Sequence, residues 1–226
     1  VCCPVWSPDG SRLAFASSQN GPLNTYWIAT DRSAPVERVM KLESWQDPTS
    51  WSPDGKALLV EDQTPEGGFD ISALSTEGDR KSVPLVHGSA NEEGGQFSPD
   101  GHWIAYQSNE SGRFEVYVTA YPGPGGRFQV STDGGENPVW SRDGREIFFR
   151  RGKAMMAAPV DTRTKFQAGL PRALFDIAAS EDFDVAPDGR FVFVRLAGEK
   201  APRSLAVVLG WFDDLKRRVA PEDKHP

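Results

Sequence analysis

The sequence has few residues of the kinds that usually carry chemistry. Its 226 residues include three histidines and two cysteines, and the cysteines are the neighbours Cys2 and Cys3. Adjacent cysteines bridge only with strain, so we expect two free thiols and no disulfide framework. The histidines His87, His102 and His225 stand in unrelated contexts, whereas a metalloenzyme would cluster them. We therefore expect no metal and no cofactor.

Excess positive charge, long apolar runs and long helical periods are also missing. The formal net charge is −7 and the pI about 5.1, which argues against a basic surface for nucleic acid. No apolar run approaches the roughly 20 residues that span a bilayer, and no signal peptide is recognisable. The chain opens on Val1 and enters its first motif at Trp6, so we interpret it as a piece of a longer protein without membrane contact of its own.

What the sequence does have is one pentapeptide in five copies. Trp6-Ser7-Pro8-Asp9-Gly10 returns at 51–55, 97–101, 140–144 and 185–189, the last two copies having diverged. Its aspartates lie 45, 46, 43 and 45 residues apart, which defines an internal repeat. Proline, aspartate and glycine in this order favour a tight turn that glycine closes with a positive φ. The predicted turn residues are Asp9, Gly10, Asp54, Gly55, Asp100, Gly101, Asp143, Gly144, Asp188 and Gly189.

Strands are predicted on both sides of each turn. An apolar residue precedes each aspartate by three, and we expect these residues to pack one repeat on the next: Trp6, Trp51, Phe97, Trp140 and Val185. Three apolar residues in a row follow each turn, such as Leu58, Leu59 and Val60, which predicts a strand buried on both faces. Two further short runs complete most repeats. Four strands in about 45 residues are typical of a blade of an all-β propeller.

One propeller domain is predicted over residues 1–210, followed by a short helix and polar tail over 211–226. An unbroken repeat favours one domain over two at this length. The last blade is expected to have three strands, and the five repeats to be part of a larger propeller. The predicted blades span about 4–42, 50–88, 94–134, 138–177 and 183–210.

The repeated residues are interpreted as scaffold, because every blade needs the same turn and the same packing. Features that occur once are the alternative places for a site. Trp45 lies in a predicted loop, either as a binding anchor or as a lid over the core. Arg150, Arg151 and Lys153 form a basic tip that faces solvent or an anionic partner.

The motif resembles the TolB-like, WD40-like propeller repeat, since it is followed by Leu13-Ala14-Phe15 in one copy and Ile104-Ala105-Tyr106 in another. Residues 112–118, 129–131, 183–189 and 207–216 also look like the C-terminal sensor region of bacterial eukaryotic-type serine/threonine kinases. That resemblance implies a kinase domain and a membrane span upstream in some relatives, and a location on the extracytoplasmic side of the cell envelope. The kinase motifs themselves do not occur in this sequence.

Three functions are open at this point. The favoured one is a non-catalytic sensor module that binds a protein, a peptide or an envelope ligand. The alternatives are a TolB-like envelope assembly component, and the propeller of a prolyl-oligopeptidase-like hydrolase whose catalytic domain is absent. Catalysis by this segment is not expected, because the sequence has no Gly-x-Ser-x-Gly nucleophile elbow.

Overall fold

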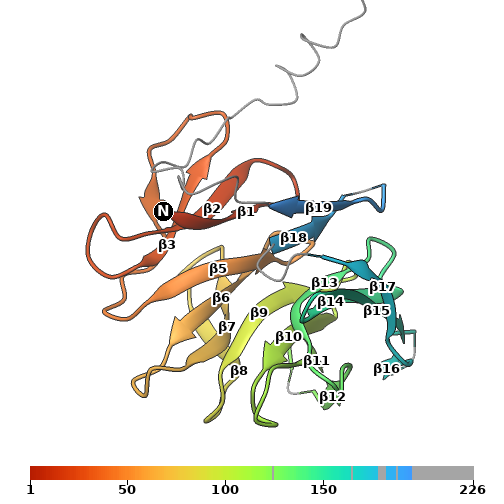
Figure 1. The fold of residues 1–226 in the computed structure, drawn as a ribbon. Helices are drawn as coiled ribbons and strands as arrows, with labels where there is room; N and C mark the ends of the chain where they lie inside the picture. The colour runs from red at the N-terminus through yellow and green to blue at the C-terminus, as the bar shows by residue number, and fades with distance from the viewer. Residues whose placement is uncertain (124, 164, 178–181, 187, 195–226) are drawn as a thin grey trace, which may run out of the picture.

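Antiparallel β-sheets make up the part of the chain that the structure describes. The computed structural model describes residues 1–123, 125–163, 165–177, 182–186 and 188–194. Four sheets follow one another along the chain, and a hairpin begins a fifth. Figure 1 shows them fanned around a common centre, with β1, β5, β9 and β13 towards the middle. The all-β propeller that the repeat predicted is confirmed.

Each of the first three blades has four strands in chain order, with the first strand innermost. Blade 1 consists of β1 (Cys2–Trp6), β2 (Arg12–Ser17), β3 (Asn24–Ala29) and β4 (Glu37–Arg38). Blade 2 consists of β5 (Gln46–Trp51), β6 (Ala57–Gln63), β7 (Phe69–Ser75) and β8 (Ser82–Val86). Blade 3 consists of β9 (Glu92–Phe97), β10 (Trp103–Ser108), β11 (Glu115–Ala120) and β12 (Arg127–Gln129).

Blade 4 has one more strand than the others. It consists of β13 (Glu136–Trp140), β14 (Glu146–Arg151), β15 (Ala154–Asp161), β16 (Gln167–Ala168) and β17 (Arg172–Asp176), and β15 pairs with both β16 and β17. The hairpin of β18 (Asp182–Val185) and β19 (Phe191–Val194) begins blade 5. The third strand expected in the last blade, and the short helix and polar tail expected over 211–226, lie outside the described residues. None of the described segments is a helix of the length and apolarity that a bilayer crossing requires.

The inner strands begin earlier than the sequence pattern placed them. Blade 2 starts at Gln46 and blade 3 at Glu92, where starts near 50 and 94 were expected, and blades 1 and 4 are each extended by two residues. The first residues of these strands are polar, such as Asp47 and Glu93. Their backbone pairing with the neighbouring strand makes them strand, and a hydrophobic pattern does not register that pairing.

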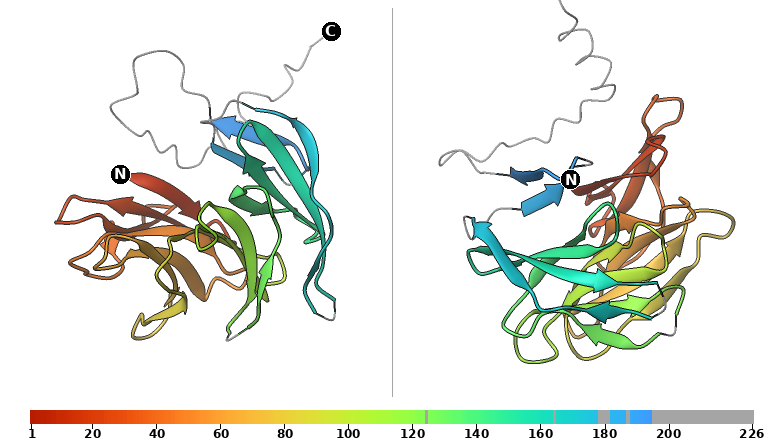
Figure 2. Two further views of the ribbon diagram at one scale, coloured as in Figure 1. Left: turned by 60° about the horizontal axis from the view of Figure 1, so that its bottom comes forward. Right: turned by 90° about the vertical axis from the view of Figure 1, so that its right-hand side faces the viewer.

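The hydrophobic core lies between blades, and the second strand of a blade supplies two of its layers. Leu58 and Val60 join the cluster shared with blade 1, whereas Leu59 joins the cluster shared with blade 3. All three side chains are fully buried. Successive side chains of a strand point to opposite faces, so a strand between two neighbouring blades is apolar on both. Figure 2 shows the sheets packed side by side in chain order.

Candidate functional site

The five motif copies form the same hydrogen-bonded turn. The glycine N–H donates to the carbonyl of the first turn residue at 2.9 Å in every copy, and the glycines have φ from +68° to +82°. Each aspartate accepts a hydrogen bond of 3.0–3.2 Å from the N–H two residues on: Ser11, Lys56, His102, Arg145 and Arg190. Hydrogen bonds from Ser7 and Ser11 lower the pKa of Asp9 to about 2. The aspartates are thus engaged within their own turns.

The serine of the motif completes the turn, a role that the sequence analysis did not assign. In four copies its Oγ donates to the aspartate at 2.5–2.7 Å and accepts the N–H five residues on at 2.9–3.0 Å. The copies are Ser7, Ser52, Ser98 and Ser141, and Ala186 stands in the fifth. The repetition of serine at one period was the available signal, because a hydroxyl can donate and accept at once.

The motif's apolar residues lie between blades near the centre of the propeller. The Trp51 indole Nε1 donates to the Val5 carbonyl of blade 1 at 3.1 Å, and the Trp140 Nε1 donates to the Gln96 carbonyl of blade 3 at 3.2 Å. Trp51 is 7 % exposed, and Phe97, Trp140 and Val185 are equally buried. Trp6 differs, since half of its surface is exposed. Its equivalents pack on the preceding blade, and among the described residues none precedes blade 1.

All five motifs meet at a cavity that we call the turn mouth. Its volume is about 410 Å³, within the range of ligand pockets. Its walls combine aromatic rings, prolines and a few polar groups: Val5, Trp6, Pro8, Thr49, Ser50, Trp51, Pro53, Gln96, Phe97, Ser98, Pro99, Val139, Trp140, Arg142, Asp184 and Val185. The structure therefore brings together the residues that the sequence predicted for blade packing, whereas none of the predicted Asp-Gly turn residues lines the cavity. The wall thus presents both polar and apolar surface to the cavity.

Two charged residues line the turn mouth. Arg142 stands where Pro8, Pro53 and Pro99 stand in the first three copies, and its side chain is exposed. Asp184 belongs to β18, and its carboxylate accepts the N–H of Val185 at 2.7 Å. Among the described residues no ion pair involves Arg142. The mouth thus has a cation that pairs with no acidic residue in the described part of the chain.

Carboxylates gather at the opposite ends of the inner strands. Asp47 and Glu61 are opposite each other in the register of β5 and β6. The carboxylate of Glu61 accepts the N–H of Gly94 at 2.6 Å. Burial, and then the charge of Asp47, raise the pKa of Glu61 to about 8. Burial also raises the pKa values of Asp47 and Glu93, and that of the Cys3 thiol, which contacts Asp47. Cys2 and Cys3 are free thiols.

No group of three or more histidine, cysteine or acidic residues in the described part of the chain is arranged to hold a metal ion. His87 follows β8 and His102 lies in the turn after Gly101, so the fold keeps these two histidines apart. His225 lies outside the described residues. At the basic tip, Arg150 pairs with Glu136, and Arg151 lies 3.8 Å from a carboxylate oxygen of Asp133. Trp45 packs edge-on against Phe69 and donates its indole N–H to Asp47 at 2.9 Å.

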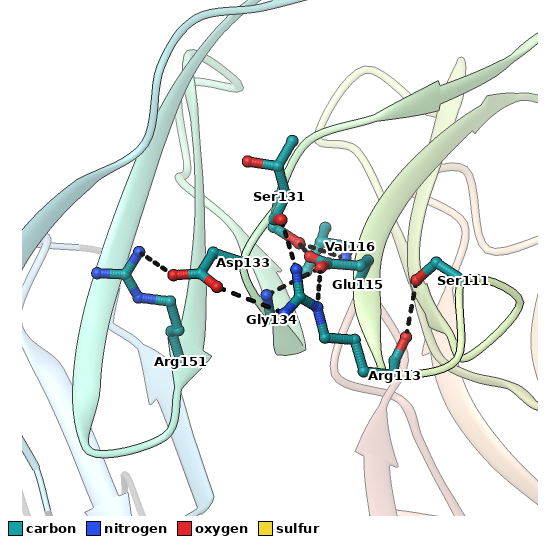
Figure 3. A network of polar contacts seen from close by, with 9 residues as sticks. Ser111, Arg113, Glu115, Val116, Ser131, Asp133, Gly134 and Arg151 are labelled. Atoms are coloured by element: carbon teal, nitrogen blue, oxygen red, sulfur yellow. Dashed lines mark hydrogen bonds and ion pairs between the residues drawn. The ribbon is translucent and has the colours of Figure 1, made fainter.

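A second repeated contact links the third strand of blades 1, 2 and 3 to the loop that follows the blade, and sequence reasoning missed it. The side chains of Asn24, Asp70 and Glu115 each accept an N–H from the loop that leads to the following blade: those of Leu42, Gly88 and Gly134. Figure 3 shows the Glu115 version, in which Ser131 and Arg113 also donate to the carboxylate. We call these contacts the loop clasps. Burial opposes ionisation of Glu115, but the donors outweigh it and lower its pKa.

Comparison with known proteins gives distant relatives. No family model matches the sequence. The chain is 27% identical over 205 residues to an uncharacterised protein of Agrobacterium fabrum, a match that covers 84% of this chain and 68% of that protein. It is 24% identical over 140 residues to the uncharacterised peptidase YuxL of Bacillus subtilis, which covers 47% of this chain and 21% of YuxL. The propeller chain therefore accounts for only part of each relative.

Solved structures of propellers share the fold. TolB from Acinetobacter baumannii superposes with a TM-score of 0.66 at 21% identity, over 83% of this chain and 46% of that chain. The β-propeller domain of Cps50 (Swd1) from Myceliophteria thermophila gives 0.62 at 16% identity, over 85% and 61%. The chain thus has the β-propeller fold of these proteins, and the TolB-like, WD40-like resemblance is confirmed at the level of the fold. The resemblance to a kinase sensor region stays a prediction.

Proposed function

We propose that this chain is a non-catalytic binding module whose turn mouth holds a segment of a protein or peptide. The observation that carries the proposal is a cavity of about 410 Å³ that all five motif copies line and in whose wall Trp6 is half exposed. Large aromatic side chains that a fold leaves uncovered are frequent anchors of protein interfaces. Catalysis has less support, because the motif aspartates are occupied by their own turns and the two described histidines lie apart.

The parent protein that fits this proposal is a bacterial signalling protein with the propeller as its C-terminal sensor on the extracytoplasmic side. The kinase-like stretches of the sequence support that role, and the likeness to TolB supports an envelope location. An envelope assembly component is the alternative that TolB itself suggests. The partial match to YuxL keeps a hydrolase parent as a further alternative. The complete coding sequence of the protein distinguishes these parents.

Selection of displayed peptides on the immobilised protein tests the binding role. We expect selected peptides to lose binding to Trp6→Glu, because the substitution replaces the exposed apolar surface of the indole by a charge. Val83→Glu is the matched control, since Val83 lies on the outer strand β8 and is also about half exposed. Peptides that bind both variants as well as the wild type would place the binding surface elsewhere and contradict the proposal.

A further inference from the structure

We propose that the turn mouth selects segments in which a carboxylate adjoins an apolar side chain, and that Arg142 is the residue that determines this selectivity. This inference rests on the proposed function and names the chemistry of the bound segment. The carboxylate can be the C-terminus of a chain or an acidic side chain. Both present the same planar pair of oxygens, which the guanidinium fork of arginine can bind with two hydrogen bonds.

The first argument is that Arg142 is not required by the turn in which it stands. The fourth copy keeps the geometry of the others, with Ser141 donating to Asp143 at 2.7 Å and the Gly144 N–H donating to the Ser141 carbonyl at 2.9 Å. Proline occupies the equivalent position in three described copies, at Pro8, Pro53 and Pro99. Proline is also the residue that the second position of such a turn favours. The fold therefore does not explain an arginine here.

The second argument is that the next motif glycine makes no close approach to Arg142, unlike the glycines that follow Pro53 and Pro99. Pro53 lies 3.3 Å from the position of a Cβ added to Gly101, and Pro99 lies 3.7 Å from that of Gly144, so in these blades the motif proline fits against the next turn. A Cβ added to Gly189, in the turn that follows Arg142, meets no atom within 4 Å, and the same holds for Gly55, in the turn that follows Pro8. Arg142 therefore lacks this contact, as Pro8 does, and its exposed side chain lies on the cavity wall.

The third argument is electrostatic. The other charged residue of the wall is Asp184. Its carboxylate accepts a hydrogen bond from the Val185 N–H, and no ion pair joins it to Arg142. The remaining wall residues are uncharged. Arg142 is exposed, so solvent screens its attraction for a ligand carboxylate, and the preference we expect comes from the two hydrogen bonds of the guanidinium fork. Trp6, which is half exposed, then supplies surface for the neighbouring apolar side chain.

The test follows the indole N–H signal of Trp6 by NMR, assigned with Trp6→Phe, while three peptides are added to the full chain. The peptides are acetyl-Pro-Leu-Phe with a free carboxylate, the same peptide as its C-terminal amide, and acetyl-Glu-Leu-Phe amide. We expect at least one carboxylate peptide to bind about tenfold more tightly than the neutral amide, as one charge-assisted contact allows. The two carboxylate peptides distinguish a C-terminus from an acidic side chain.

Arg142→Pro is the decisive variant, because it restores the residue that the other turns contain and its melting curve verifies the fold. We expect it to remove the tenfold preference while binding of the neutral amide is unchanged. Arg145→Ala is the matched control, since Arg145 is in the same turn but does not line the cavity. Asp184→Asn should tighten binding of the carboxylate peptides, because it removes the like charge.

The outcomes separate this inference from the proposed function. Equal binding of the three peptides, unchanged in Arg142→Pro, would overturn the role of Arg142 and leave the turn mouth as a binding site. Peptides that do not shift the Trp6 signal at any concentration would remove both proposals. A carboxylate preference that survives Arg142→Pro but is lost in Arg145→Ala would show that Arg145 determines the selectivity, and it would overturn the role proposed for Arg142.

Discussion

The indole Nε1 of Trp51 donates a hydrogen bond of 3.1 Å to the backbone carbonyl of Val5, which belongs to the preceding blade. The same indole stacks on Trp27 of that blade, with ring centroids 6.1 Å apart. One side chain thus joins two blades by a polar contact and an apolar one. Trp6 stands at the same place in the repeat, yet half of its surface is exposed.

This difference predicts unequal effects of one substitution at two equivalent positions. Trp51→Ala should lower the free energy of unfolding by about 3–5 kcal/mol, because it leaves a cavity between blades 1 and 2. Trp6→Ala should cost less than about 1 kcal/mol, because its side chain is half exposed. Urea denaturation of both variants measures the two values. Similar losses in both would mean that Trp6 packs as its equivalents do.

The hydrogen bonds of the motif serine predict that two substitutions change the free energy of unfolding in opposite directions. Ser52→Ala should cost about 1–2 kcal/mol, because the buried N–H of Ala57 loses its acceptor and Asp54 loses a donor. Ala186→Ser should stabilise by about 0.5–1 kcal/mol, because it supplies the hydroxyl that the fifth turn lacks. Thermal melts of both variants measure the shifts. A destabilising Ala186→Ser would show that the fifth turn differs from the other four.

The raised pKa of Glu61 predicts that the stability of the folded protein falls as the pH rises. Its pKa is raised from the ordinary value of 4.5 to about 8, so the folded state holds a proton that the unfolded state releases. The penalty therefore grows from about pH 4.5 and is complete above about pH 8. Glu61→Gln keeps an acceptor for the Gly94 N–H and should stabilise the protein by about 1–2 kcal/mol at pH 8.5. Near pH 4.5 the two proteins should melt alike, and a pH-independent gain would contradict the titration.

The lowered pKa of Glu115 predicts the reverse, a contribution to stability that is lost as the pH falls. Burial opposes its charge, but the donors Ser131, Gly134 and Arg113 lower its pKa, so its contribution is present above the ordinary value and is lost as the pH falls through the lowered one. Glu115→Gln should cost about 1–3 kcal/mol at pH 7, because the amide replaces an acceptor by a donor. The difference from the wild type should shrink towards pH 4. Denaturant midpoints at several pH values measure it, with Glu66→Gln on an exposed turn as the neutral control.

Residues at the two ends of the inner strands show how far prediction from sequence reached. The turn aspartates and the apolar residues three before them were found because they recur at one period and carry strong local preferences. Asp47, Glu61 and Glu93 were missed, because polar residues at a strand start give no hydrophobic signal and their proximity depends on neighbouring blades. Asn24, Asp70 and Glu115 also recur, but their different side chains hid a shared role as acceptors.

The sequence by itself determined the repeated blade, its turn and the two-sided core of its second strand, because short-range hydrogen bonds and side-chain alternation are set within one repeat. Only the tertiary structure decided which copies of the motif are covered. Trp51 is buried and Trp6 is half exposed, although both stand in the same five residues. In the sequence Arg142 is only a departure from the proline of the motif, and the tertiary structure places it as a cation on a cavity wall. The reason is that burial and cavities depend on neighbours that lie a whole repeat away along the chain.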